Sequence, residues 1–118
     1  DLVPGAKIFI DKIRSFDNIQ LIFLSNRMAK NLAPTIQNMK ALGIYDEQDI
    51  FLLRENKQDK KYIRRNEIML GTGRMQNTGP MKILSYFGDA RHDFPDEDNI
   101  YRFGENMFMF PNPMYGKW

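Results

Sequence analysis

The stretch IQLIFLSNR, residues 19–27, places a nearly continuous apolar run directly before the polar residues Ser, Asn and Arg. Short apolar runs of this kind are typical of strands buried on both faces, as in parallel sheets that helices cover. Similar runs predict further strands at residues 50–53, 81–87 and 107–110. Segments with helical patterns separate these strands, which predicts an α/β fold with a mostly parallel sheet and three layers.

Two of the predicted helices are recognised by apolar spacing and by their end signals. Pro4 suits the first turn of a helix, and apolar residues recur after it at helical intervals. A second amphipathic pattern runs over residues 28–42 and stops at Gly43, a residue typical of helix ends.

The third predicted helix is basic. Residues 57–70 are charged and lack Gly and Pro, and helical spacing would place Lys57, Lys60 and Arg64 on one face. Considered alone, such a charge run is typical of a solvated surface. Residues 71–80 hold three glycines and a proline, which predicts a mobile connection.

Length and composition limit the function classes. The chain has 118 residues and no cysteine, and its 17 basic and 15 acidic side chains give a net charge of +2. These values fit one globular domain, and they exclude a disulfide scaffold and a disordered chain. No apolar run approaches the roughly 20 residues of a membrane-spanning helix. The basic excess is too small to indicate a nucleic-acid partner.

The first candidate site follows the strand at residues 19–24. A hydroxyl, an amide and a guanidinium, from Ser25, Asn26 and Arg27, leave this strand together and could hold an anion such as phosphate. The alternative is that Ser25 caps the following helix and that Arg27 is solvated.

The second candidate site follows the strand at residues 81–87. Asp89 and Asp93 lie four residues apart in a tight loop that begins with Gly88. Mg²⁺ prefers a few carboxylates and waters, so this loop could coordinate the metal. The alternative is that the carboxylates cap the backbone of their own loop. His92, between them, is expected to be exposed and to have no catalytic partner.

Six segments of the chain, taken in order, resemble a known family of phosphatases. They are VPGA (residues 3–6), IFLSNR (22–27), LGI (42–44), NKQDKKYIRR (56–65), GDARHDF (88–94) and FPNPMYGKW (110–118). This ordered set resembles the haloacid dehalogenase superfamily, and most closely its class C acid phosphatases, the family of the bacterial lipoprotein 5′-nucleotidases. The resemblance implies the haloacid-dehalogenase-like three-layer sandwich.

The resemblance also implies roles for the candidate residues. Ser25 matches the family's hydroxyl that binds the transferring phosphoryl group, and Asn26 lies beside it. Lys60 matches the lysine that neutralises phosphate and nucleophile, and Lys57 is the alternative in register. Asp89 matches a ligand of Mg²⁺, and Asp93 matches the carboxylate that supports the water shell of the metal. Phosphoryl transfer depends mainly on positioning and charge neutralisation, and these groups supply both.

The family's first motif, D-x-D-E-T, follows no apolar strand in this chain. It holds the nucleophilic Asp that forms an aspartyl-phosphate, and in the family it precedes the VPGA-type segment. We therefore expect it upstream of Asp1, so that residues 1–118 form the C-terminal portion of a single phosphatase domain that lacks its central strand. The chain alone would then be inactive, whereas the complete protein would be an acid phosphatase or 5′-nucleotidase. The alternative is a non-catalytic member that binds phosphate ligands or a partner.

Partners and location follow from the resemblance alone. It implies small phosphomonoester substrates, with nucleoside monophosphates among the candidates, and a homodimer. It also implies the bacterial periplasm or outer membrane, with membrane attachment only through an N-terminal lipid anchor absent from residues 1–118.

Overall fold

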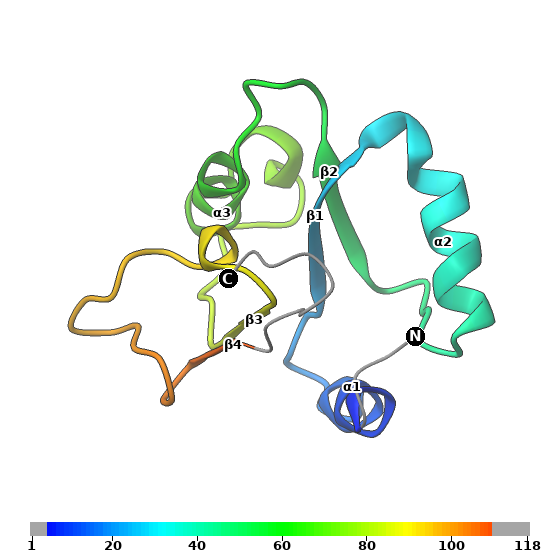
Figure 1. Cartoon of the computed structure of the whole chain (residues 1–118), viewed down its shortest axis with the longest axis horizontal. Coiled ribbons are helices and arrows are strands. Elements are labelled where there is room, and N and C mark those ends of the chain that lie inside the picture. Colours follow the sequence, from blue (N-terminus) through cyan, green and yellow to red (C-terminus); the bar gives the residue numbers. More distant parts are fainter. Residues whose placement is uncertain (1–4, 110–118) are drawn as a thin grey trace. The chain divides into compact units, whose positions relative to one another are not determined.

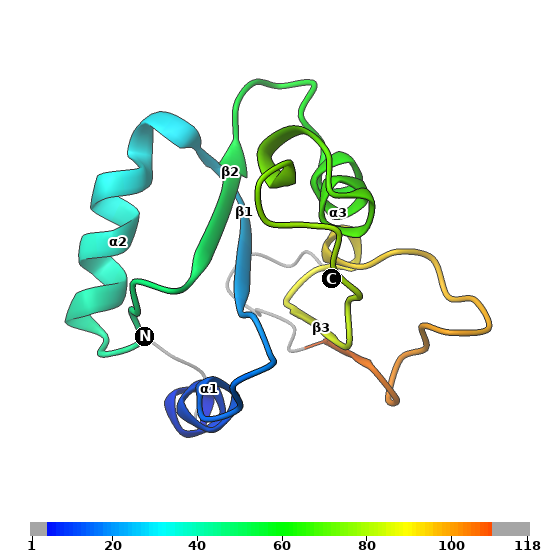
Figure 2. The ribbon, with the colours of Figure 1, turned by 180° about the vertical axis from the view of Figure 1, so that it is seen from behind.

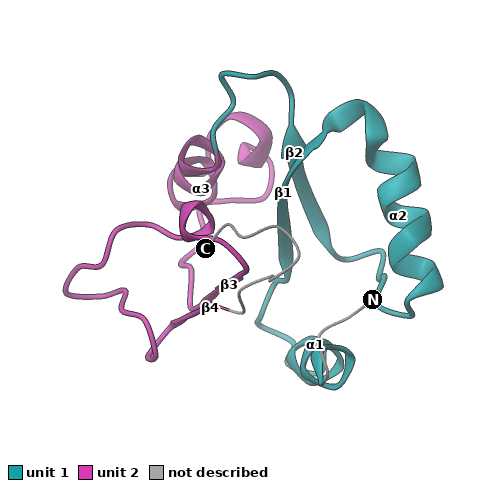
Figure 3. Ribbon diagram, in the orientation of Figure 1, with its two compact units in different colours: residues 1–60 teal, residues 61–118 magenta. Residues whose placement is uncertain are grey.

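A computed structural model describes residues 5–109 of the chain (Figure 1). The chain divides into two compact units, unit 1 at Asp1–Lys60 and unit 2 at Lys61–Trp118, and each is described by itself (Figure 3). The predictions about Pro4 and about the segment 110–118 concern positions outside the described residues.

Unit 1 is built around a pair of parallel strands. Its elements are α1 (Ala6–Arg14), β1 (Ile22–Met28), a short 3₁₀ helix η1 (Ala29–Asn31), α2 (Leu32–Ala41) and β2 (Ile50–Arg54). β1 and β2 run parallel, and Phe23 lies opposite Phe51 in their register. Parallel neighbours need a crossover connection, which α2 provides, and Figures 1 and 2 show this helix alongside the strand pair. The predicted parallel pairing and α/β character are therefore confirmed for this unit.

Residues of β2 and of the segment before it form the core of unit 1. Ile44, Leu52 and Leu53 are buried, and the rings of Phe23 and Phe51 stack with their centroids 5.3 Å apart. β1 itself is only half-buried over Ile22–Ser25, so the expectation that its run is buried on both faces is wrong. Within residues 5–109, β1 pairs with one strand, β2.

Gly43 ends α2 as the sequence predicts. Its φ of 74° lies in the left-handed region that favours glycine, and its N–H donates to the carbonyl of Lys40 at 3.0 Å. An ion pair between Arg14 and Asp49 then connects α1 to the turn before β2, and Arg14 also donates to the carbonyl of Ile44. These contacts join α1 to the segment between α2 and β2.

Unit 2 also contains a parallel strand pair, which is shorter. Its elements are α3 (Lys61–Leu70), η2 (Gly73–Met75), β3 (Tyr86–Gly88), η3 (Arg91–Asp93) and β4 (Met107–Met109). Its core contains Ile68, Met75, Phe94 and Met107, all buried. Among the helices of residues 5–109, none is long and apolar enough to cross a membrane.

The predicted basic helix begins later than expected. Lys57 and Lys60 therefore lie outside it, and the predicted basic face is wrong. α3 starts at Lys61; before it, residues 57–58 form a turn and residues 59–60 have no regular structure. The side chain of Asn56 accepts the N–H of Gln58 at 2.9 Å, and Asp59 accepts the N–H of Glu55 at 2.9 Å. Such local side-chain bonds compete with helix formation. Within α3, Arg64 is fully buried, so the expectation of a solvated face is also wrong there.

The segment between α3 and β3 differs from the prediction at both of its ends. Residues 71–80, expected as a mobile connection, contain η2, and Met75 in this helix is fully buried. Residues 81–85, expected as strand, are irregular, and the strand is confined to Tyr86–Gly88. A strand needs a hydrogen-bonded partner, and as far as residue 109, the last residue that the structure describes, β4 offers three residues for pairing.

Candidate active site

The loop that follows β3 is organised by the carboxylate of Asp93. One of its oxygens, Oδ2, accepts the backbone N–H groups of Asp89 at 2.9 Å and of Ala90 at 3.1 Å. The other oxygen forms an ion pair with Lys61, the first residue of α3. Both side chains of this pair are largely buried, with exposed fractions of 10% for Asp93 and 13% for Lys61. Asp93 therefore closes the loop and fastens it to α3.

The protonation of Asp93 follows from these contacts. Burial by itself would raise the pKa of this carboxyl, but the hydrogen bond and charge of Lys61, together with the N–H groups of Asp89 and Ala90, lower it below its ordinary value. In the folded loop, the carboxyl group of Asp93 is therefore ionised at neutral pH.

Asp89 has a different environment from Asp93. It is exposed, and its carboxylate has no hydrogen bond or ion pair with the residues between 5 and 109. The backbone N–H of Asp89 is held by Asp93, so the position of its Cα is fixed while its side chain stays available. Of the two carboxylates predicted to bind a metal, Asp89 is the one available to a cation. Asp93 caps the backbone of its own loop, as the alternative prediction from the sequence had it.

Gly88, which precedes Asp89, has no room for a side chain. A Cβ atom at this position would lie 2.5 Å from Cβ of Asp93 and 2.6 Å from its carboxylate oxygen Oδ2. We expect Gly88→Ala to displace Asp93, to lower the free energy of unfolding by about 1–3 kcal/mol and to reduce any activity of the loop. Urea unfolding and enzyme assays of the same sample check both effects.

Gly104→Ala is the matched control for Gly88→Ala. Its Cβ would meet no atom within 4 Å, although its φ of 86° disfavours alanine. We expect a stability loss of about 1–2 kcal/mol without a change in activity. Equal activity losses in the two variants would contradict the role given to Gly88.

Ser25 and Asn26 lie within β1 and not after its end as predicted. The strand continues to Met28, and its register with β2 shifts between Ser25 and Met28, as at a β-bulge. The hydroxyl of Ser25 accepts the N–H of Arg27 at 3.1 Å, whereas the guanidinium of Arg27 donates to Thr35 of α2 at 3.3 Å. Asn26 is exposed and Ser25 is half-buried. Bulges often turn side chains toward a functional site.

Of the two lysines considered from the sequence, Lys57 lies in the turn before α3 and Lys60 directly precedes the helix. Lys57 and Lys60 are both exposed, and Arg54 holds the backbone of this turn by donating to the carbonyls of Asn56 at 3.0 Å and of Lys57 at 2.8 Å. Lys61 pairs with Asp93 in the structure, although its place in the sequence does not mark it as a site residue. No local pattern distinguishes Lys61 from Lys60, because the pairing joins residues 32 positions apart.

The predicted site residues are thus distributed over both units. Asp89 and Asp93 share one loop in unit 2, whereas Ser25, Asn26 and Lys60 belong to unit 1. His92 is exposed as predicted, and its Nε2 lies 3.8 Å from Oδ1 of Asp93.

A magnesium ion is compatible with the loop after β3. Between residues 5 and 109 there is no cluster of three or more metal-binding side chains. Mg²⁺ does not require one, since it commonly binds through one or two carboxylates and completes its shell with water and substrate phosphate. The available carboxylate of Asp89 meets this requirement.

A comparison with known protein families decides the classification. Residues 1–118 match the family described as HAD superfamily, subfamily IIIB (Acid phosphatase). The chain belongs to this family. The resemblance noted in the sequence is confirmed, because class C acid phosphatases of the haloacid dehalogenase superfamily fit this description. The subfamily IIIB match supports hydrolysis of phosphoric monoesters. No curated protein and no solved structure matches the chain significantly.

Proposed function

We propose that the complete protein is a Mg²⁺-dependent phosphomonoesterase, an acid phosphatase of the 5′-nucleotidase type. The observation that carries the proposal is the loop after β3 in a chain of the acid phosphatase family: Asp93 and Lys61 fix the loop, and the carboxylate of Asp89 stays exposed. The proposal includes that Ser25, Asn26 and Lys60 of unit 1 act together with Asp89 of unit 2 on one phosphoryl group.

The proposed reaction proceeds through an aspartyl-phosphate. A carboxylate of an Asp upstream of Asp1 attacks phosphorus, the ester P–O bond breaks, and the leaving oxygen takes a proton from the second Asp of the same D-x-D motif, so that the product departs as an alcohol. Water then hydrolyses the acyl phosphate. Bound Mg²⁺ supplies positive charge that stabilises the phosphoryl oxygens in both steps.

Each residue of this chain has a separate task in the proposal. Asp89 holds the metal, and Asp93 keeps the backbone of Asp89 in place. Ser25 and Asn26 donate hydrogen bonds to the phosphoryl oxygens, and Lys60 neutralises their charge. No D-x-D sequence follows a strand between residues 5 and 109, so the nucleophile is assigned outside this range.

Removal of the metal tests the proposal directly. We expect the full-length protein to lose p-nitrophenyl phosphate hydrolysis by about a hundredfold or more in EDTA, and to regain it with Mg²⁺, because a lysine alone does not replace the divalent charge that Mg²⁺ would supply to the phosphoryl oxygens. Ca²⁺ is the matched control, since its larger radius and irregular shell suit the site poorly. Full turnover in EDTA after dialysis would contradict the metal dependence.

The three lysines near the start of α3 are separated by single substitutions. We expect Lys60→Gln to lower kcat by about 10–100-fold without loss of stability, because an exposed cation that acts on phosphate contributes little to folding. Lys61→Gln should lower both activity and stability, since it breaks the pair with Asp93. Lys57→Gln is the control and should change neither.

The same three variants decide whether Lys60 or Lys57 is the lysine that binds phosphate. A large kcat loss in Lys57→Gln together with full activity in Lys60→Gln would assign the phosphate-binding role to Lys57. Thermal unfolding of all three variants in the same buffer separates the loss of a catalytic charge from the loss of the fold.

A further inference from the structure

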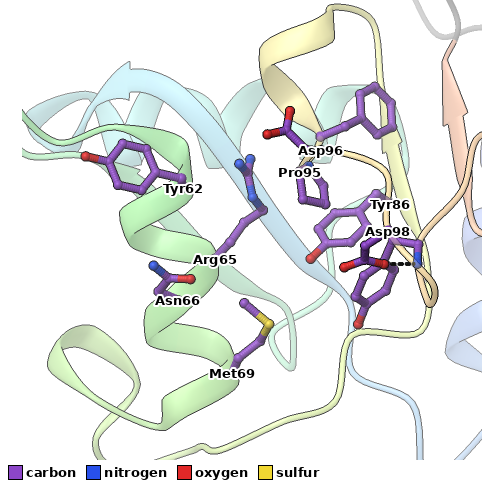
Figure 4. Close-up of a pocket in the computed structure, with 10 residues that line it drawn as sticks. Tyr62, Arg65, Asn66, Met69, Tyr86, Pro95, Asp96 and Asp98 are labelled. Atoms are coloured by element: carbon purple, nitrogen blue, oxygen red, sulfur yellow. Dashed lines mark hydrogen bonds between the residues drawn. The ribbon is translucent and has the colours of Figure 1, made fainter.

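Unit 2 contains a pocket whose lining includes neither Asp89 nor Asp93. Its volume is about 450 Å³, within the range of small-molecule sites (Figure 4). One wall is a single face of α3, with Tyr62, Arg65, Asn66 and Met69 at helical spacing. The opposite wall comes from β3 and the loop after η3, and includes Tyr86, Phe94 and Tyr101.

Arg65 is a buried cation in this pocket. Its exposed fraction is 8%, and burial is the largest cause that lowers the pKa of its guanidinium. Its one hydrogen bond within residues 5–109 runs from Nη1 to the carbonyl of His92 at 3.4 Å, and it forms no ion pair with these residues. Arginine stays charged in proteins, and buried charges are normally paired. The guanidinium therefore offers several N–H donors to a ligand acceptor.

Tyr86 supplies a second donor on the other wall. Burial, followed by the influence of Tyr101, raises the pKa of Tyr86 to about 12, so its hydroxyl keeps its proton at neutral pH. Figure 4 shows this hydroxyl directed toward α3, and it has no hydrogen-bond partner in the described part of the chain. Two donors thus line one open cavity to which aromatic side chains also contribute.

The charged residues that line the pocket favour a ligand of low negative charge. Asp96 and Asp98 also line the pocket, but Asp96 pairs with Arg91 at 3.1 Å, and the carboxylate of Asp98 accepts the N–H groups of Ile100 and Tyr101 at 2.7 Å each. The two carboxylates repel a phosphate dianion about twice as strongly as a monoanion, so a single carboxylate is the better partner for Arg65.

We propose that this pocket binds a small aromatic monocarboxylate, with the carboxylate on Arg65 and Tyr86 and the ring among Tyr62, Phe94 and Tyr101. The aromatic side chains provide the apolar contacts, and the buried guanidinium provides the charge-assisted hydrogen bonds. This site does not depend on the phosphatase reaction, and its test uses binding alone.

The experiment compares two ligands that differ in one group. Phenylacetate is titrated into the full-length protein and followed by calorimetry and by the ¹⁵N shift of the Arg65 Nε–H group. We expect a Kd of about 1 mM, in keeping with a ligand of this size. Phenylacetamide, which keeps the ring and loses the charge, should bind about tenfold more weakly. Inorganic phosphate should neither bind the pocket nor displace phenylacetate.

Two substitutions in the pocket and one outside it complete the test. Arg65→Gln and Tyr86→Phe should weaken phenylacetate binding by about tenfold and threefold, respectively. Arg74→Gln is the control, because Arg74 pairs with Glu67 at 2.7 Å and does not line the pocket. If Arg65→Gln fails to fold, Tyr86→Phe and the two ligands still decide the result. Equal binding of phenylacetate and phenylacetamide, displacement by phosphate, or no binding at 20-fold the expected Kd (about 20 mM) would overturn the proposal.

Discussion

Asp89→Asn is expected to lower Mg²⁺-dependent hydrolysis of p-nitrophenyl phosphate by about a thousandfold in the full-length protein, and Asp89→Ala to abolish it. The physical reason is that Asp89 is exposed and is the carboxylate of its loop without another partner in residues 5–109. An amide is a poor ligand for Mg²⁺ where the site depends on charge. Steady-state kinetics at several Mg²⁺ concentrations measure the effect.

Asp17→Asn is the matched control for the Asp89 variants. Asp17 is also exposed, but it lies in the turn after α1, in unit 1. This variant should keep full activity, and all variants should unfold at similar temperatures, because exposed carboxylates contribute little to stability. Retained turnover in Asp89→Ala would reject the metal site, and it would leave the binding pocket of unit 2 unaffected.

Asp93→Ala is expected to cost about 3–5 kcal/mol in the free energy of unfolding, the largest stability effect predicted for this chain. The substitution leaves Lys61 without its partner and removes the acceptor of the Asp89 and Ala90 N–H groups. Asp93→Asn keeps an oxygen acceptor and should cost about 2 kcal/mol. Activity should fall with both, because Asp89 loses its fixed backbone position. Urea unfolding and kinetics measure the two effects.

A double-mutant cycle assigns this cost to the ion pair. Lys61→Gln, Asp93→Asn and the double variant should show a coupling of about 1–3 kcal/mol. Additive effects would contradict a direct interaction between these side chains. Glu67→Gln with Arg74→Gln gives a comparison pair in the same unit, at side-chain exposures of 17% and 22%.

The contribution of Asp93 to the free energy of unfolding is expected to decrease at low pH. Because folding lowers the pKa of Asp93, the folded state favours the ionised carboxylate. The contribution is fully present above the ordinary pKa of an aspartate, about 3.9, and is lost as the pH falls through the lower value of the folded state. The stability difference between wild type and Asp93→Asn should therefore be constant from pH 7 to 5 and shrink below pH 4.

The sequence determined the features that depend on neighbouring residues. The strand at residues 50–53 and the end of α2 at Gly43 follow from local apolar patterning and backbone freedom, and both are confirmed. The loop with Asp89 and Asp93 is also found directly after a strand, as predicted. The ordered motifs identified the phosphatase family, which the family comparison confirms over residues 1–118.

Tertiary contacts decided the features that join distant residues. The basic helix begins at Lys61 because Asn56 and Asp59 bind backbone groups of the preceding turn, a competition that charge patterning does not reveal. In the part of unit 2 that the structure describes, β3 pairs with β4 over three residues, and residues 81–85 take no part in this pairing. Lys61, the partner of Asp93, is 32 positions away in the sequence. Only the tertiary structure could therefore reveal that Asp93 is paired and that Asp89 is available. The sequence thus determined which charged side chains the loop contains. The tertiary structure determined that, within residues 5–109, Asp93 is paired in the fold and Asp89 is not.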